Sequence, residues 1–157
     1  MHSTPTLDVV GAGRVDDSRY RALARELGLD ERITWHPLLS QAELAALYRK
    51  AALHVIPAVD EGLGLTAVES LLSETPVVAF DSGGIGDVVR SDRSGILVPV
   101  GDTAGLAAAI DRLLTNDPLR AEFGHEGRRD ALERFSPDAV ASQYAGLLRQ
   151  VAGRVRA

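Results

Sequence analysis

The sequence predicts an α/β fold with a doubly wound parallel sheet and C-terminal helices. Short apolar runs alternate with helical patterns as far as residue 100, and this alternation is typical of a parallel sheet with helices on its faces. Each run is nearly all apolar, as strands buried on both faces are. Glycines gather directly after three of the runs, at the sheet edge where such folds bind ligands.

Five strands and their connecting helices follow from these patterns. The predicted strands cover Leu7–Val10, Ile33–His36, Leu53–Ile56, Val77–Phe80 and Ile96–Val98. Apolar positions with helical spacing fall at Tyr20, Leu23, Ala24 and Leu27 in the first helix and at Leu44, Leu47, Tyr48 and Ala51 in the second. Ser40 and Glu43 form a capping box, which predicts the start of the second helix.

Helical patterns dominate after residue 100. Asp102 is expected to cap a helix that runs through Leu114. Asp117 and Ser136 each precede a proline, which predicts two further N-caps with Pro at the first helical position. The last helix carries one apolar stripe, formed by Val140, Tyr144, Leu147, Leu148 and Val151. Because no linker or repeat divides the 157 residues, we expect one Rossmann-like domain over residues 1–157.

Composition excludes several classes of protein. No apolar run approaches the roughly 20 residues of a membrane-spanning helix, and the absence of Cys rules out disulfides and thiolate metal sites. The net charge is -5 and only 4% of residues are aromatic, so a nucleic-acid interface is not expected. The four histidines lack metal-ligand spacing and are expected to be structural or exposed. The N-terminus does not resemble a signal peptide, and a cytoplasmic location is expected.

The first glycine cluster, "GAGR", follows the first predicted strand. A dinucleotide-binding G-x-G-x-x-G motif would need Gly at position 16, where Asp16 stands, and the second strand lacks the expected acidic residue. Nicotinamide cofactors are therefore not expected. Gly11 and Gly13 indicate either a tight strand-to-helix turn or a turn that approaches a ligand.

The second cluster, "DEGLGLTAVES", carries more information. Gly62 and Gly64 allow unusual backbone angles, and a helix starting near Leu63 or Gly64 would offer unpaired N–H groups at its positive end. Such a helix start suits a diphosphate without a metal ion. The third cluster, "DSGGIGDVV", repeats the design, and Gly83 and Gly84 form either an anion-binding nest or a simple turn.

Two glutamates lie within the second cluster. Glu69 borders the expected apolar stripe of the helix, formed by Leu65, Val68 and Leu72, and a partly desolvated carboxylate needs hydrogen-bond donors. Vicinal ribose hydroxyls would supply two donors, but spacing alone favours an ordinary salt bridge to Arg. Glu61 is either a site residue or an exposed loop acid.

These clusters together resemble a known family. The stretches "LDVVGAGR", "ERITWHPLLSQAELAALYRKAALHVIPAVDEGLGLTAVESLLSETPVVAFDSGGIGDVVRSDRSGILVPVGDTAGLAAAIDRLL" and "RRDALERFS" resemble, in order and over nearly the whole chain, the C-terminal, donor-binding domain of family 4 retaining nucleotide-sugar glycosyltransferases, which have the GT-B fold. The E-x7-E spacing of Glu61 and Glu69 is specific only within this setting.

The resemblance implies roles for these residues and a substrate. The chain would bind a nucleoside-diphosphate sugar, with no separate cofactor and no metal, for retaining transfer of the glycosyl group. Glu69 would accept hydrogen bonds from the ribose, and Glu61 would face the donor sugar and the reacting centre. The turn and helix start, Gly62 to Thr66 (Gly62, Leu63, Gly64, Leu65 and Thr66), would hold sugar and phosphate groups. Leu39 would line the base pocket, with Gly11 and Gly13 near the donor.

The sequence departs from the family's pattern in two respects. The acceptor-binding N-terminal domain is expected to be absent, and so is the first strand of the C-terminal domain that this chain resembles. We therefore expect the isolated chain to be inactive. The other departure is in the "SETPVV" stretch: Glu74 stands where the family has Gly, and we expect a local adjustment of the turn. A conservative change stands beside these two: Asp87 replaces the family's Glu.

Two rival interpretations stay open. One is a non-catalytic nucleotide-binding or interaction module that kept the fold. The other is half of a sugar-nucleotide epimerase. Peripheral membrane association of a full enzyme stays open as well.

Overall fold

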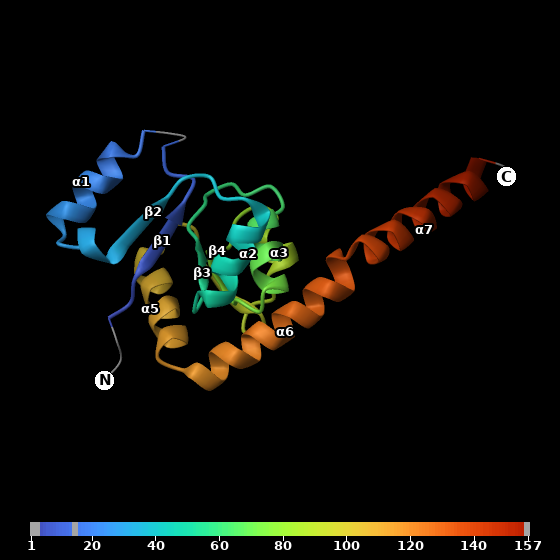
Figure 1. Cartoon of the computed structure of the whole chain (residues 1–157). Helices are drawn as coiled ribbons and strands as arrows, with labels where there is room; N and C mark the ends of the chain where they lie inside the picture. The colour runs from blue at the N-terminus through green and yellow to red at the C-terminus, as the bar shows by residue number, and fades with distance from the viewer. Residues whose placement is uncertain (1–3, 14–15, 156–157) are drawn as a thin grey trace. The chain divides into compact units, whose positions relative to one another are not determined.

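The computed structural model describes residues 4–13 and 16–155, which form two compact units. The first unit ends at Ala46 and the second begins at Leu47, so the boundary falls within helix α2, Gln41–Lys50. Figure 1 shows the elements in chain order from blue to red. His2 of the four histidines and Arg14 of the "GAGR" turn lie outside the described residues.

The first unit contains a two-stranded parallel sheet and one covering helix. Strand β1, Leu7–Val10, pairs with β2, Ile33–His36, and Leu7 lies opposite Ile33 in the register. Between them run α1, Ser18–Glu26, and the short 3-10 helix η1, Asp30–Arg32. Both strand predictions are confirmed residue for residue.

The second unit contains a three-stranded parallel sheet in the order β3-β4-β5. Its elements are β3 His54–Ile56, α3 Leu65–Leu72, β4 Val77–Phe80, α4 Ile85–Val88, β5 Gly95–Val98, α5 Thr103–Leu114, α6 Asp117–Phe135 and α7 Pro137–Val155. The bounds of β3 and β5 differ by one residue from the prediction. Pairing sets these ends: His54 is the first residue of β3 in register, opposite Val77, and Gly95 also lies opposite Val77.

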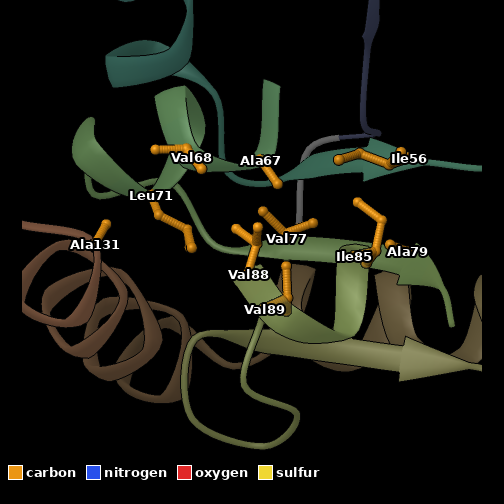
Figure 2. Close-up of a cluster of buried hydrophobic side chains, with 10 residues drawn as sticks. All are labelled: Ile56, Ala67, Val68, Leu71, Val77, Ala79, Ile85, Val88, Val89 and Ala131. Atoms are coloured by element: carbon orange, nitrogen blue, oxygen red, sulfur yellow. The ribbon is translucent and has the colours of Figure 1, made fainter. Parts of the chain in front are cut away.

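The core of the second unit occupies both faces of its sheet. All four residues of β4 are buried, and successive side chains point to opposite faces. Val77 and Ala79 pack with side chains of α3 and α4 and with Ala131 of α6 (Figure 2). Val78 and Phe80 pack with residues of α5 and α6 in a second cluster. The prediction of helices on both faces is confirmed for this sheet.

The predicted helix starts are mostly confirmed. Glu43 Oε2 accepts from the backbone N–H of Ser40 at 2.8 Å, as a capping box requires, and Asp102 Oδ1 accepts from the N–H of Gly105 at 2.8 Å. The cap of α6 is Asn116 rather than Asp117, because the Asn116 side chain reaches the N–H of Leu119. Among the described helices, none has the length and apolar character needed to cross a membrane.

Candidate functional site

The turn between β3 and α3 is fixed by a glutamate and a glycine. Gly64 is the N-cap of α3 and has a φ of +80°, a conformation that L side chains rarely adopt. Glu61 Oε1 accepts a hydrogen bond from the N–H of Gly64 at 3.2 Å. The Glu61 side chain is half-buried, so it is not the freely exposed loop acid that spacing allowed. Its carboxylate lies at the entrance to α3.

The turn between β4 and α4 packs against this turn, backbone to backbone. The N–H of Gly84 donates to the carbonyl oxygen of Glu61 at 2.9 Å. A Cβ on Gly83 would lie 1.9 Å from the carbonyl oxygen of Glu61, and one on Gly84 would lie 2.2 Å from that of Gly62. Only glycine fits at either position, which gives the "DSGGIG" cluster a structural reason: it supports the turn that carries Glu61.

The first turn of α3 presents unpaired donors. The carbonyl oxygen of Gly64 accepts from the N–H groups of Ala67 and Val68, at 2.9 and 3.2 Å. The N–H groups of Leu65 and Thr66 make no hydrogen bond within the described part of the chain, and both residues are exposed. Gly62 and Leu63 are exposed as well, whereas Gly64 is buried. The positive end of the α3 dipole therefore faces outward with free donors, an arrangement that binds anions.

Glu69 lies on the partly open face of α3. The buried residues of this helix are Ala67, Val68, Ser70 and Leu71, while Leu65 is 65% exposed and Leu72 is half-buried. The predicted stripe is confirmed at Val68 and Leu72, which pack in the core, and is wrong at Leu65. Glu69 shares its face with exposed Leu65, one turn before it. Within the residues that the structure describes, half-buried Glu69 takes part in no ion pair, so the expected bridge to an arginine is not formed.

Tyr48 lies within electrostatic range of Glu69, a proximity that no sequence pattern predicted. Burial raises the pKa of the Tyr48 phenol to about 12, and the negative charge of Glu69 contributes to the rise. The position of Tyr48 is fixed because Thr75 Oγ1 donates to its carbonyl oxygen at 2.6 Å. Helical spacing marked Tyr48 only as a core residue, and it is 7% exposed.

The end of α3 confirms the adjustment expected at Glu74. This residue adopts a left-handed conformation with a φ of +62°, and its N–H donates to the carbonyl oxygen of Leu71 at 2.9 Å. Its carboxylate pairs with His125 and Arg128 of α6, at 3.2 and 3.7 Å. Glu74 thus adopts a conformation that glycine would adopt without strain, and its side chain contacts α6.

Three predicted site residues belong to the first unit. Gly11 and Gly13 have φ values of +94° and +82°, and an added Cβ would meet nothing within 4 Å at either position. The N–H groups of Gly11 and Ala12 donate to the carbonyl oxygen of His36, at 3.1 and 2.9 Å. Backbone conformation therefore explains these glycines without a ligand. Leu39 is half-buried in the segment before α2.

The histidines and carboxylates of the described residues form no metal site. No group of three or more such side chains in these ranges could hold a metal ion. His36 Nε2 instead contacts Asp8 Oδ1 at 2.6 Å, and His54 packs edge-on against Tyr48 with ring centroids 5.1 Å apart.

Comparison with known proteins identifies relatives. Residues 1–130 match the family model described as glycosyl transferases group 1. A D-inositol 3-phosphate glycosyltransferase from Acidothermus cellulolyticus is 38% identical over 154 residues, which is 95% of this chain and 34% of the relative. A sucrose-phosphate synthase from Thermosynechococcus elongatus superimposes with a TM-score of 0.83 and 32% identity, covering 95% of this chain and 39% of the other. TarM of S. aureus, in a structure with UDP and other ligands, gives a TM-score of 0.81 with 26% identity, over 90% and 28% of the two chains.

The curated relatives are much longer than this chain. The chain spans about a third of the curated relatives that it matches. The family match itself covers most of the chain, and the fold agrees with that of the solved glycosyltransferase structures. The chain belongs to the group 1 glycosyl transferases and has the fold of their C-terminal GT-B domain.

Proposed function

We propose that the chain is the donor-binding half of a retaining glycosyltransferase and binds a nucleoside-diphosphate sugar at the start of α3. The observation that carries the proposal is a combination found within the described residues: the N–H groups of Leu65 and Thr66 make no hydrogen bond there, and the Glu69 carboxylate forms no ion pair there. Hydrogen-bond donors that suit an anion and a hydrogen-bond acceptor thus lie on one short helix. A nucleoside diphosphate carries the complementary groups: phosphate oxygens and vicinal ribose hydroxyls.

The phosphate groups would be held by the helix start. Unpaired N–H groups and the positive dipole end stabilise an anion without a metal ion. The same donors would stabilise the diphosphate as it departs with the bonding electrons of the glycosidic bond, because fixed dipoles act on the charge that develops in the transition state. We therefore expect chelators to leave nucleotide affinity unchanged.

The two glutamates would contact different parts of the donor. Glu69 would accept hydrogen bonds from two ribose hydroxyls and fix the nucleotide. Glu61, which the Gly64 N–H and the neighbouring turn hold at the helix entrance, would face the sugar and the reacting anomeric carbon. Transfer would require an acceptor-binding domain, since the relatives are about three times as long as the match.

Titration calorimetry with UDP, GDP and ADP tests the proposal on the chain as it exists. TarM was solved with UDP, so UDP is the first ligand to test. We expect weak binding, and Glu69→Gln should lower affinity about ten- to a hundredfold, because a charge-assisted hydrogen bond contributes roughly 1.5 to 3 kcal/mol. Glu61→Gln should barely change affinity for the bare nucleotide.

The matched control is Glu122→Gln on α6, which removes the same charge at an exposed position. Thermal melts of all variants must agree with the parent before affinities are compared. Undiminished UDP, GDP or ADP binding by Glu69→Gln, or equal losses in Glu69→Gln and Glu122→Gln, would overturn the assignment of Glu69.

A further inference from the structure

The last turns of α6 carry two arginines that reach the ends of other helices. Both lie in the "RRDALERFS" stretch, which the donor site does not use. Arg128 Nη1 donates to the carbonyl oxygen of Leu72, the last residue of α3. Arg134 Nη2 donates to the carbonyl oxygen of Asp87, and Arg134 Nη1 lies 3.5 Å from that of Val88, the last residue of α4. Helix α6 thus supplies donors to the C-terminal ends of both helices.

Helices α3 and α4 also meet at their other ends. The N-cap of α3 is Gly64 and that of α4 is Gly84, and they belong to the two turns that pack backbone to backbone. The last carbonyls of a helix have no partner within it and form the negative end of its dipole, so a guanidinium there is favourable. Helix α6 therefore holds, at their C-terminal ends, the two helices whose N-terminal ends border the turn of Glu61.

The two helices depend on their arginines to different degrees. Helix α3 packs closely on α6, because a Cβ on Gly127 would lie 2.7 Å from Leu71 Cδ2. This contact fixes α3 against α6 even without Arg128. Helix α4 is a single turn of four residues, and the hydrogen bonds of Arg134 join its end to α6. We therefore expect Arg134 to matter more than Arg128 for the position of the helix that it holds.

Arg134 is itself held by a chain of charged side chains. Asp130 Oδ2 accepts from Arg134 Nη1 at 2.6 Å, and Asp130 Oδ1 accepts from Arg90 Nε at 2.8 Å. Partial burial would raise the pKa of Asp130, but the hydrogen bonds from Arg90 and Arg134 outweigh this effect and lower the pKa below its usual value. The carboxylate therefore stays charged. A planar guanidinium can serve a carboxylate and backbone carbonyls at once, for which an ammonium group has a poorer geometry.

Helix α4 contacts the Glu61 turn at two points. The N–H of Gly84 donates to the carbonyl oxygen of Glu61 at 2.9 Å, and a Cβ on Gly64 would lie 2.6 Å from Ile85 Cδ1. Ile85 is fully buried and belongs to the core cluster shown in Figure 2. Because so little space separates the two segments, a shift of α4 would move the Glu61 turn with it.

We propose that Arg134 is a positioning residue for the candidate site. By fixing the C-terminal end of α4, Arg134 fixes the glycine turn on which Glu61 rests, and with it the place of the Glu61 carboxylate at the entrance to α3. What that carboxylate faces rests on the proposed function, whereas the coupling from Arg134 to Glu61 is a property of the folded chain alone.

Amide hydrogen exchange, measured by NMR without a ligand, tests the coupling. The amides of Gly84 and Gly64 both donate to Glu61, through its carbonyl oxygen and its carboxylate. In Arg134→Gln we expect these two amides to exchange about tenfold faster relative to the β4 amides, because a charge-assisted hydrogen bond is lost and the turn opens locally. A merely destabilising change would speed exchange in β4 and in the turns alike. Arg134→Lys keeps the charge and should restore part of the protection.

Two further variants make the result decisive. Arg129→Gln is the matched control, because Arg129 is 65% exposed in its side chain and pairs with Glu126 of the same helix. It should leave both amides as they are in the parent. Asp130→Asn releases Arg134 without removing it and should speed exchange at the same two amides, even if Arg134→Gln does not fold. Unchanged exchange at Gly84 in Arg134→Gln and Asp130→Asn, or an equal change in Arg129→Gln, overturns the proposal.

Titration of the parent with UDP separates this inference from the proposed function. If the parent binds no UDP but Arg134→Gln speeds exchange at Gly84 and Gly64, the coupling stands and the donor site fails. If the parent binds UDP but exchange at both amides is the same in Arg134→Gln, the donor site stands and the role of Arg134 is overturned.

Discussion

Strands β1 and β4 have nearly the same sequence character and very different surroundings. Both are four-residue parallel strands, "LDVV" and "VVAF". All of β4 is buried between two strands and two layers of helix, whereas three of the four residues of β1 are exposed. In the first unit only Ala24 is buried among the described residues. The comparison teaches that an apolar run predicts a strand, while the number of neighbouring elements decides what that strand contributes to stability.

The largest expected effect comes from removing matched leucines in the two units. Leu71 is fully buried against β4, and Leu71→Ala should lower the free energy of unfolding by about 2 to 5 kcal/mol. Leu23→Ala, at a half-exposed position of α1, should cost less than about 1 kcal/mol.

Urea denaturation followed with two probes measures both changes. Trp35 is the one tryptophan of the chain and lies in the first unit, while far-UV circular dichroism follows the helices, most of which lie in the second. We expect the Trp35 transition at lower urea than the dichroism transition, and Leu71→Ala to move the latter. Coincident transitions in every variant would show that the two units unfold together and would break the comparison.

The next largest expected effect is the pH dependence of stability caused by His54, the first residue of β3. Burial lowers the pKa of His54 to about 4, and its Nδ1 has no hydrogen-bond partner within the described residues. Because the folded pKa lies below the unfolded value of about 6.5, stability is present above pH 6.5 and is lost as the pH falls toward 4. We expect a loss of about 2 kcal/mol between pH 6.5 and 4.5 from this group.

Comparison with His54→Phe isolates the contribution of the histidine from those of the carboxylates. Urea midpoints of the dichroism transition are measured at both pH values, and the pH-dependent difference should shrink in the variant. Equal pH dependence in His54→Phe and the parent contradicts the prediction.

The smallest expected effect comes from a helix cap in the second unit. Asp102→Ala removes the acceptor for the Gly105 N–H at the start of α5 and should cost about 1 kcal/mol. The dichroism transition should move to lower urea, and the Trp35 transition should stay in place. A parallel shift of both transitions would indicate that α5 also stabilises the first unit.

Much of the fold could be predicted because short apolar runs between helical patterns leave a clear signal in the sequence, whether or not the strand is buried. Three strands were predicted to the residue, and Ser40, Asp102 and Ser136 were correctly identified as caps because their side chains accept hydrogen bonds from specific N–H groups. Periodicity could not tell which side of α3 is buried, since Leu65 and Leu71 are equally apolar and only packing against β4 distinguishes them. Pairing between strands is also absent from local sequence, so the separate two- and three-stranded sheets were not foreseen.

The position of the candidate site could be predicted from the sequence, but the tertiary contacts within it could not. The start of α3 and its glycines were found from the sequence, but the approach of Gly83 and Gly84 to the Glu61 turn joins residues about 20 positions apart. Electrostatic contact between Tyr48 and Glu69 is likewise a tertiary feature. The roles of Glu61 and Glu69 toward a donor came from resemblance to a family and stay predictions.

The backbone contact between the two glycine turns limits how this domain can be redesigned. Since the carbonyls of Glu61 and Gly62 leave no room for a side chain at Gly83 or Gly84, neither loop can change its path while the other keeps its own. A single loop with a different path, grafted in place of one of them, would therefore clash with the other. The two loops must therefore be replaced together, along with the strand ends that hold them.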